Sequence, residues 1–180
     1  MTARQPVAEL VIVGVDPGGR VTGIVARHRD RLIAHDVIAR DGRVNARTIA
    51  DAGYAWRVLS GVEDAYHQAS KLARQIAFNP VGLRLCVAVE GLTPPTPHRG
   101  MTNPAGTLAA AVVLGAVLGR WPGAVVVPPG GHGAGPLAAY PAELAGPGEK
   151  AGTGVLRHAR SAWDVAGAAV TLLRVAEAAR

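Results

Sequence analysis

The chain has 180 residues, 49% of them hydrophobic but only 4% aromatic, and its 19 Lys and Arg against 13 Asp and Glu give a net charge of +6. This length suits one domain with a full core of aliphatic side chains, and the mostly arginine charge excess favours a polyanionic partner. A lone cysteine excludes a disulfide framework and a cysteine-based zinc site.

Neither the N-terminal residues nor the longest apolar segment points to a membrane. Residues 1–8 hold no apolar stretch of the kind found in a secretion signal, and we expect them to be flexible. The longest apolar segment, residues 105–119, is shorter than the roughly 18–20 residues that a membrane span requires. We therefore expect a soluble protein without a membrane partner, located in the cytoplasm of a bacterium or a phage-infected host cell.

The first half of the chain predicts three strands, a helix and a fourth strand. Apolar runs at residues 10–15, 22–27 and 31–38 are separated by short Gly- and Asp-containing breaks, which favours an antiparallel meander. A helical spacing of apolar residues follows and ends near residue 78, where Asn-Pro stops it. The continuous apolar run at residues 83–89 is typical of an interior strand.

The second half predicts two more helices and a short strand. A proline-rich loop over residues 93–103 precedes a helix at 105–119, and a short strand follows at 124–127. Residues 128–154 are rich in Gly and Pro and predict a long loop, after which the last helix is expected from about residue 161. This order of elements predicts one α/β domain, residues 1–180, with a mixed sheet.

Three acidic residues stand at positions where a ligand could bind. Asp16 and Glu90 each end a predicted buried strand, and Asp164 lies near the start of the last helix. If the two strands are parallel neighbours, both carboxylates emerge at the sheet edge where open α/β sheets bind ligands. Converging carboxylates repel one another unless a cation lies between them, and Mg²⁺ or Mn²⁺ suits such oxygen ligands.

Each acid also has an explanation without a metal. Asp16 opens a Pro-Gly-Gly turn whose backbone an aspartate commonly caps, and Glu90 fits the first solvated residue after a strand. Residues 161–164, Ser-Ala-Trp-Asp, match a helix capping box. The glycine-rich stretch 128–136 lacks the GK[ST] ending of a P-loop. Turn and cap chemistry do not require two buried strands to end on acids, and this conjunction favours a metal site.

Several strings of the sequence together resemble one family. GVDPGGRVTGIV, residues 14–25, resembles the first strand pair of the RuvC-type Holliday junction resolvases, which belong to the RNase H-like nuclease superfamily. CVAVEGL at 86–92 is similar to the strand that ends in that family's second catalytic acid, and GEK at 148–150 and HARSAWDVAGAAVTLL at 158–173 follow in the expected order. The resemblance implies an RNase H-like three-layer α/β fold, with a mixed five-stranded sheet and helices on both faces.

The resemblance also implies an activity and its residues. It implies an endonuclease that resolves four-way DNA junctions with two Mg²⁺ ions, or Mn²⁺, bound by Asp16, Glu90 and Asp164. Asp16 would bridge the ions and the other two acids would hold one each. Lys150 resembles the family's basic active-site lysine, and it or His158 would assist with charge or proton transfer.

The chain departs from the family pattern at Ser161, where the family has Asp or His three residues before its last acid. His158, three residues earlier still, is the candidate replacement; the alternatives are Ser161 itself or a water. On one continuous helix, His158 would lie roughly 120° around the axis from Asp164, whereas a helix that begins at Ser161 would let His158 fold back to the metal.

The expected partners are branched DNA and a second copy of the chain. The candidate DNA contacts are Arg20, Arg99, Lys150, Arg157 and Arg160. Residues 92–95 are Leu-Thr-Pro-Pro, without the aromatic residue that the family uses at the junction centre, so Met101 or the prolines would have to serve as a wedge. Two symmetric cuts favour a C2 homodimer, for which the face carrying Gly115 and Gly119 is a candidate interface unless it faces the sheet.

Three other functions stay open. The first is an actin-like or sugar-kinase-like ATPase domain, since D-x-G turns also bind phosphates there, although the absence of a second copy of the motif argues against it. The second is a non-catalytic, DNA-binding pseudo-nuclease in which Ser161 marks a lost site. The third is a nuclease of the same fold that acts on a flap, a fork or an RNA–DNA hybrid.

Overall fold

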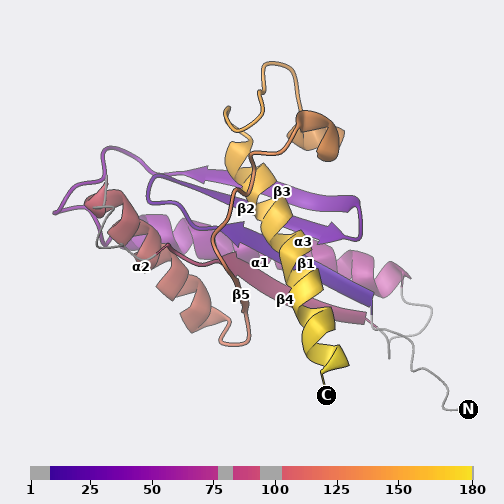
Figure 1. Ribbon diagram of the computed structural model, residues 1–180. Coiled ribbons are helices and arrows are strands. Elements are labelled where there is room, and N and C mark those ends of the chain that lie inside the picture. The colour runs from indigo at the N-terminus through magenta and orange to yellow at the C-terminus, as the bar shows by residue number, and fades with distance from the viewer. Residues whose placement is uncertain (1–8, 77–82, 94–102, 180) are drawn as a thin grey trace, which may run out of the picture.

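A computed structural model describes residues 9–76, 83–93 and 103–179 of the chain, and its centre is a five-stranded mixed sheet (Figure 1). The strands are β1 (Glu9–Asp16), β2 (Val21–His28), β3 (Arg31–Ala39), β4 (Leu83–Glu90) and β5 (Val125–Val127). Their order in the sheet is β3-β2-β1-β4-β5, with β1, β2 and β3 antiparallel and with β4 parallel to both β1 and β5. The predicted meander and interior strand are confirmed.

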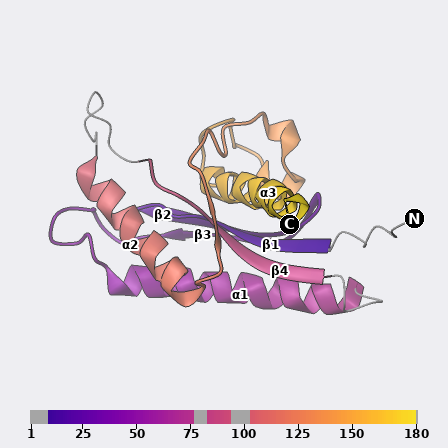
Figure 2. The same cartoon turned by 60° about the horizontal axis from the view of Figure 1, so that its bottom comes forward.

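In the described part of the chain, three α-helices cover the two faces of this sheet, so the expected α/β architecture with a mixed five-stranded sheet is confirmed. The long helices are α1 (Ala52–Ile76), α2 (Pro104–Arg120) and α3 (Arg157–Ala178), and η2 (Leu137–Ala139) and η3 (Ala142–Leu144) are short 3₁₀ helices. Figure 2 shows α1 and α2 on one side of the sheet and α3 on the other. Among the described residues, no helix combines the length and the apolar character needed to cross a membrane.

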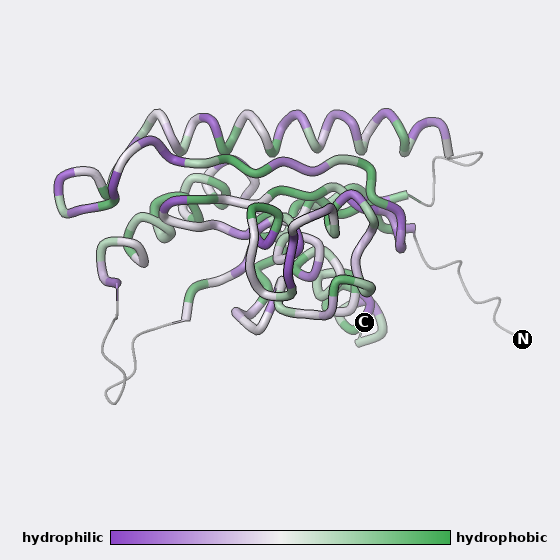
Figure 3. The backbone as a smooth tube through the Cα atoms, turned by 90° about the horizontal axis from the view of Figure 1, so that it is seen from above, coloured by the Kyte–Doolittle hydropathy of each residue, from purple (hydrophilic) through white to green (hydrophobic). Residues whose placement is uncertain are grey.

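The alternation of side chains along β1 divides the core between the two faces. Val11, Val13 and Val15 pack toward α1 and α2, whereas Leu10 and Ile12 pack toward α3, as the period of two in a strand requires. All five are almost fully buried, which explains why this strand reads as a continuous apolar run. The longest helix, α1, alternates hydrophilic and hydrophobic residues along its length, as expected of a helix with one face on a sheet (Figure 3).

Helix α2 begins where the sequence predicts and turns its glycines outward. Asn103 caps it by accepting a hydrogen bond from the Gly106 N–H at 3.0 Å. Pro104 occupies the first helical position, where an N–H would have no partner within the helix, so the missing N–H of proline costs no hydrogen bond. A Cβ placed on Gly115 or Gly119 would meet no atom within 4 Å. These two glycines therefore face away from the sheet.

Two other glycines let α3 lie directly on the sheet. A Cβ on Gly14 of β1 would lie 2.2 Å from the backbone oxygen of Ala162, and one on Gly23 of β2 would lie 2.0 Å from that of His158. Gly23 is also the register partner of Asp16. The absence of two side chains thus brings the first turns of α3 over the end of β1.

The start of α3 differs from the prediction. The helix begins at Arg157, four residues before the expected start, so Ser161 lies inside it and the proposed capping box is wrong. A local sequence match to a cap does not take account of the preceding turn. That turn ends at Gly154, which has a φ of +90°, and the Glu149 carboxylate accepts a hydrogen bond from the Leu156 N–H at 3.2 Å, just before the helix.

The substitution Gly23→Ala should lower the free energy of unfolding by about 1–3 kcal/mol, because the added methyl group overlaps a backbone oxygen that cannot move without moving α3. Gly53→Ala, in the first turn of α1, is the matched control. Its Cβ would lie at an ordinary 3.4 Å from the nearest atom. This variant should raise the free energy of unfolding by up to about 1 kcal/mol, because alanine favours the helix more than glycine does. Urea denaturation measures both, and equal effects would contradict the close-approach argument.

Candidate active site

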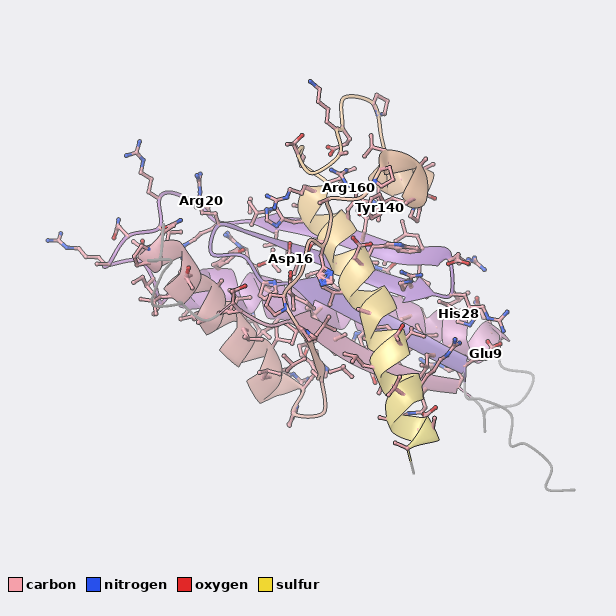
Figure 4. The ribbon with its side chains drawn as sticks, in the orientation of Figure 1. Glu9, Asp16, Arg20, His28, Tyr140 and Arg160 are labelled. Carbon is pink, nitrogen blue, oxygen red and sulfur yellow. The ribbon has the colours of Figure 1, made fainter. Side chains whose placement is uncertain are left out.

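Asp16 lies at the carboxyl end of β1 (Figure 4), where it is in direct contact with His158. The Nδ1 atom of His158 lies 2.7 Å from Oδ2 of Asp16, with the side chains 30% and 15% exposed, respectively. An ionised carboxylate only accepts hydrogen bonds, so Nδ1 is the donor in this pair. The opposite ring nitrogen, Nε2, is left to bind a metal or to move a proton.

Glu90 ends the parallel neighbour of β1 and lies beside Asp16, as predicted from the sequence. The residues before the two acids, Val15 and Val89, are register partners, so both carboxylates emerge at the same sheet edge. Burial raises the pKa of Glu90 and the negative charge of Asp16 raises it further, to about 7. The Gly130 N–H at 3.3 Å and the Ser161 hydroxyl at 3.4 Å donate to this carboxyl and oppose the rise.

Side chains from successive turns of α3 contact both acids. His158 and Ser161 are three residues apart, which places them on one face of a helix. The first contacts Asp16 and the second contacts Glu90. Of the two alternatives for His158, the continuous helix is the one observed, because α3 begins before this residue. His158 reaches Asp16 from that helix because the glycine contacts bring its first turn to the strand end.

Asp164, one turn further along α3, has other partners. Its Oδ2 accepts hydrogen bonds from the Gly133 N–H at 2.8 Å and from the Tyr140 hydroxyl at 2.9 Å. Within the described ranges, no three His, Cys, Asp or Glu side chains lie close enough together to hold one ion. The structure thus places Asp16 next to both Glu90 and His158. Asp164 is bound by the segment of residues 130–140, which also contacts Glu90.

The donor atoms at this edge fit a hard divalent cation. Two carboxylates held side by side repel one another, and burial together with this repulsion raises the pKa of Glu90. A cation between them would relieve the repulsion, and oxygen atoms with one imidazole nitrogen suit Mg²⁺ or Mn²⁺. The residues that would hold it are Asp16 and Glu90, with His158 within reach of Asp16.

The predicted basic residues divide into three groups. Arg20 in the β1–β2 turn, Lys150 and Arg157 are exposed and free to meet a phosphate, although Lys150 forms no hydrogen bond or ion pair with the acids in the described part of the chain. Arg99 lies outside the described residues, as do Met101 and the prolines proposed as a wedge. Arg160 is fully buried.

The prediction that Arg160 contacts DNA is corrected by this burial. Its guanidinium binds the Glu149 carboxylate at 2.9 Å, and the backbone oxygens of Leu144 at 2.9 Å and Lys150 at 3.1 Å and of Thr153 (Figure 4). Arg160 therefore ties the segment before α3 to the helix. The sequence carried no sign of this role, because three of the four partners are backbone oxygens, which any residue supplies.

A pocket that the sequence did not predict lies beside His158, the hydrogen-bond partner of Asp16. It has a volume of about 450 Å³ and lies between the β1–β2 turn and the start of α2, with Arg20, Leu92, Thr107 and His158 among its lining residues. A Cβ on Gly19 would lie 2.4 Å from the backbone oxygen of Gly106, so a glycine is needed where the turn meets the helix. The Gly-Gly pair after Pro17 was the only sequence signal of this close contact.

A scan against models of known protein families finds no match for this chain, and a search of curated proteins finds none either. Any function assigned to it therefore depends on its own residues and their geometry.

In EDTA, the stability of the wild-type protein relative to that of Glu90→Gln should fall as the pH rises from 5 to 8. The folded protein keeps the Glu90 proton up to about pH 7, whereas the unfolded chain releases it near the ordinary pKa of 4.5. The favourable contribution of this carboxyl is therefore complete below pH 4.5 and is lost as the pH rises through about 7.

Urea denaturation at the two pH values measures this difference. Glu143→Gln, at an exposed glutamate, is the matched control. If the two variants follow the same pH dependence relative to wild type, the buried position of Glu90 beside Asp16 is contradicted.

Proposed function

We propose that this chain is a metal-dependent endonuclease of the RNase H-like type that resolves four-way DNA junctions. The observation that carries the proposal is the pair of carboxylates, Asp16 and Glu90, at the ends of adjacent parallel strands, with His158 hydrogen-bonded to the first. The mixed sheet with helices on both faces and the Asp-Pro-Gly-x-Arg-x-Thr-Gly string of residues 16–23 support it further.

The catalytic roles follow from the positions of the side chains. Asp16 and Glu90 would hold divalent cations, which supply a more acidic bound water and stabilise the leaving 3′-oxygen of a phosphodiester. His158 donates from Nδ1 to Asp16 and so fixes the orientation of its ring. Its Nε2 is then directed by that bond to hold a proton or a ligand. Asp164 would add its Oδ1, since the hydrogen bonds it accepts from described residues both go to Oδ2.

Positive charge and the pocket support DNA as the substrate. Arg20 lines the pocket together with His158, so a strand whose phosphate lies against the acids would pass this arginine. Arg157 is exposed and precedes His158 on α3. The net charge of +6 attracts a polyanion, and the planar guanidinium of arginine suits phosphate oxygens.

Two symmetric cuts need two copies of the site, so the functional unit is a C2 homodimer. The outer face of α2 supports this assembly, because it offers no charge over three turns. Between residues 108 and 119 of this helix, the exposed residues are Leu108, Ala111, Val112, Gly115 and Gly119. A helix that is apolar on its outer face as well as its inner face is typical of one buried on both sides.

A cleavage panel tests the nuclease. With Mg²⁺, wild type should cut a labelled four-way junction into nicked duplexes, in preference to a fork, a flap, a plain duplex or an RNA–DNA hybrid. Asp16→Asn should reduce the rate by at least about 100-fold, because it removes the charge that holds the cation, and EDTA should abolish cutting. Asp64→Asn, at an exposed aspartate of α1, is the matched control and should cut normally.

The other outcomes of the panel identify the alternatives. Cleavage that survives in Asp16→Asn would contradict the site. Junction binding with no cleavage by wild type would indicate a pseudo-nuclease, and ATP binding by calorimetry with no cleavage would indicate an ATPase domain. Preference for a fork, a flap or a hybrid would keep the chemistry and change the substrate.

Light scattering after gel filtration tests the dimer. Wild type should have about twice the monomer mass of 18.4 kDa. Gly115→Glu should give the monomer, because it puts a charge into the apolar face at a position where the side chain has open space and the fold is not disturbed. Trp56→Glu, at a 70% exposed apolar side chain of α1, is the control and should remain dimeric. A monomeric wild type would contradict this assembly.

A further inference from the structure

One backbone segment contacts two of the acids assigned to the site. The Gly130 N–H donates to Oε1 of Glu90 at 3.3 Å, and the Gly133 N–H donates to Oδ2 of Asp164 at 2.8 Å. The Tyr140 hydroxyl, seven residues later, donates to the same Oδ2 at 2.9 Å. The segment of residues 130–140, which includes most of the glycine-rich stretch that is not a P-loop, therefore lies against the catalytic edge.

We propose that Tyr140 is a positioning residue for Asp164 and that it increases the affinity of the site for its divalent cation. This inference rests on the proposed function, because it concerns the ligands of the same metal site. The geometry that carries it is the pair of donors, one from Tyr140 and one from the Gly133 backbone, on a single oxygen of Asp164.

The tyrosine is itself held in place on three sides. Its ring is 8% exposed and packs with Val25, Leu144 and Trp163 between the sheet and α3. Its hydroxyl oxygen accepts a hydrogen bond from the Gly135 N–H at 3.1 Å while its proton goes to Asp164. The hydroxyl therefore has one available direction in which to donate.

The helix that carries Asp164 also fixes the segment that carries Tyr140. The buried Arg160 of α3 binds the Leu144 oxygen and the Glu149 carboxylate, both at 2.9 Å, on the far side of Tyr140. On the near side, Gly133 has a φ of +73°, and a Cβ there would lie 2.7 Å from the Arg157 oxygen. The contacts at both ends of the segment thus hold the Tyr140 hydroxyl in a fixed position relative to α3.

The chemical consequence concerns the other oxygen of Asp164. Two donors on Oδ2 fix the rotation of the carboxyl group and leave Oδ1 as its available ligand atom. A ligand that is oriented before the cation arrives loses less conformational freedom when it binds. Partners of this kind, one step removed from a metal, typically change its affinity by about 10–100-fold.

The variant Tyr140→Phe tests the inference, since it removes the hydroxyl and keeps the buried ring. Titration calorimetry with Mn²⁺ alone, on the full chain without DNA, should give about tenfold weaker binding than wild type. The Mg²⁺ concentration for half-maximal junction cleavage should rise by a similar factor, while the rate at saturating Mg²⁺ stays within about twofold. Tyr66→Phe, at a half-buried tyrosine of α1, is the matched control and should match wild type in both.

Each outcome has a distinct meaning. Unchanged Mn²⁺ affinity in Tyr140→Phe, with a wild type that binds metal and cuts junctions, overturns the positioning role alone. Tighter Mn²⁺ binding in the variant also overturns it, because the contact would then be withholding Asp164 from the metal. A wild type that binds no Mn²⁺ and cuts no junction overturns the proposed function and this inference together.

Discussion

The distance between α3 and the sheet is the constraint on which the rest of the structure depends. At Gly14 and Gly23 the backbone of the helix occupies the space that a side chain of the strand would need. A helix that packs on ordinary side chains lies further from its sheet, and the side chains of its first turn are then further from the strand ends. Here the first turn is low enough for His158 to reach Asp16 and for Ser161 to reach Glu90. A site at this edge is possible because two strands carry hydrogen atoms in place of side chains.

The second consequence is electrostatic. Parallel pairing of β1 and β4 brings two carboxylates to one edge, and their repulsion adds to the cost of burial. The surrounding donors, an imidazole, a hydroxyl and a backbone N–H, offset part of that cost but carry no permanent positive charge. The nearest buried guanidinium on α3, that of Arg160, is already paired with Glu149. The two carboxylates are thus held together, and a cation could bind between them.

The segment of residues 128–154 is part of the same arrangement. With only two short 3₁₀ helices of its own, it takes its position from α3, through Arg160 on one side and Gly133 on the other. In return it supplies Tyr140 and two backbone N–H groups to the acids. This chain has Ser161 in place of an Asp or His. Polar groups from the irregular segment of residues 128–154 surround its acids.

The sequence by itself determined the strands and the mixed sheet, because hydrophobic periodicity and the end of an apolar run are local properties. It placed Asp16 and Glu90 at strand ends, and the parallel pairing of β1 and β4 made them neighbours. It did not determine where α3 begins, that Arg160 is buried, which groups bind Asp164, or that a pocket lies beside Arg20. Each of these depends on atoms brought together from distant parts of the chain. Many of them are backbone oxygens, which no residue name reveals, or atoms that lie against a glycine from a distant part of the sequence. The tertiary structure decided them, because the depth at which a helix packs on a sheet depends on both surfaces at once.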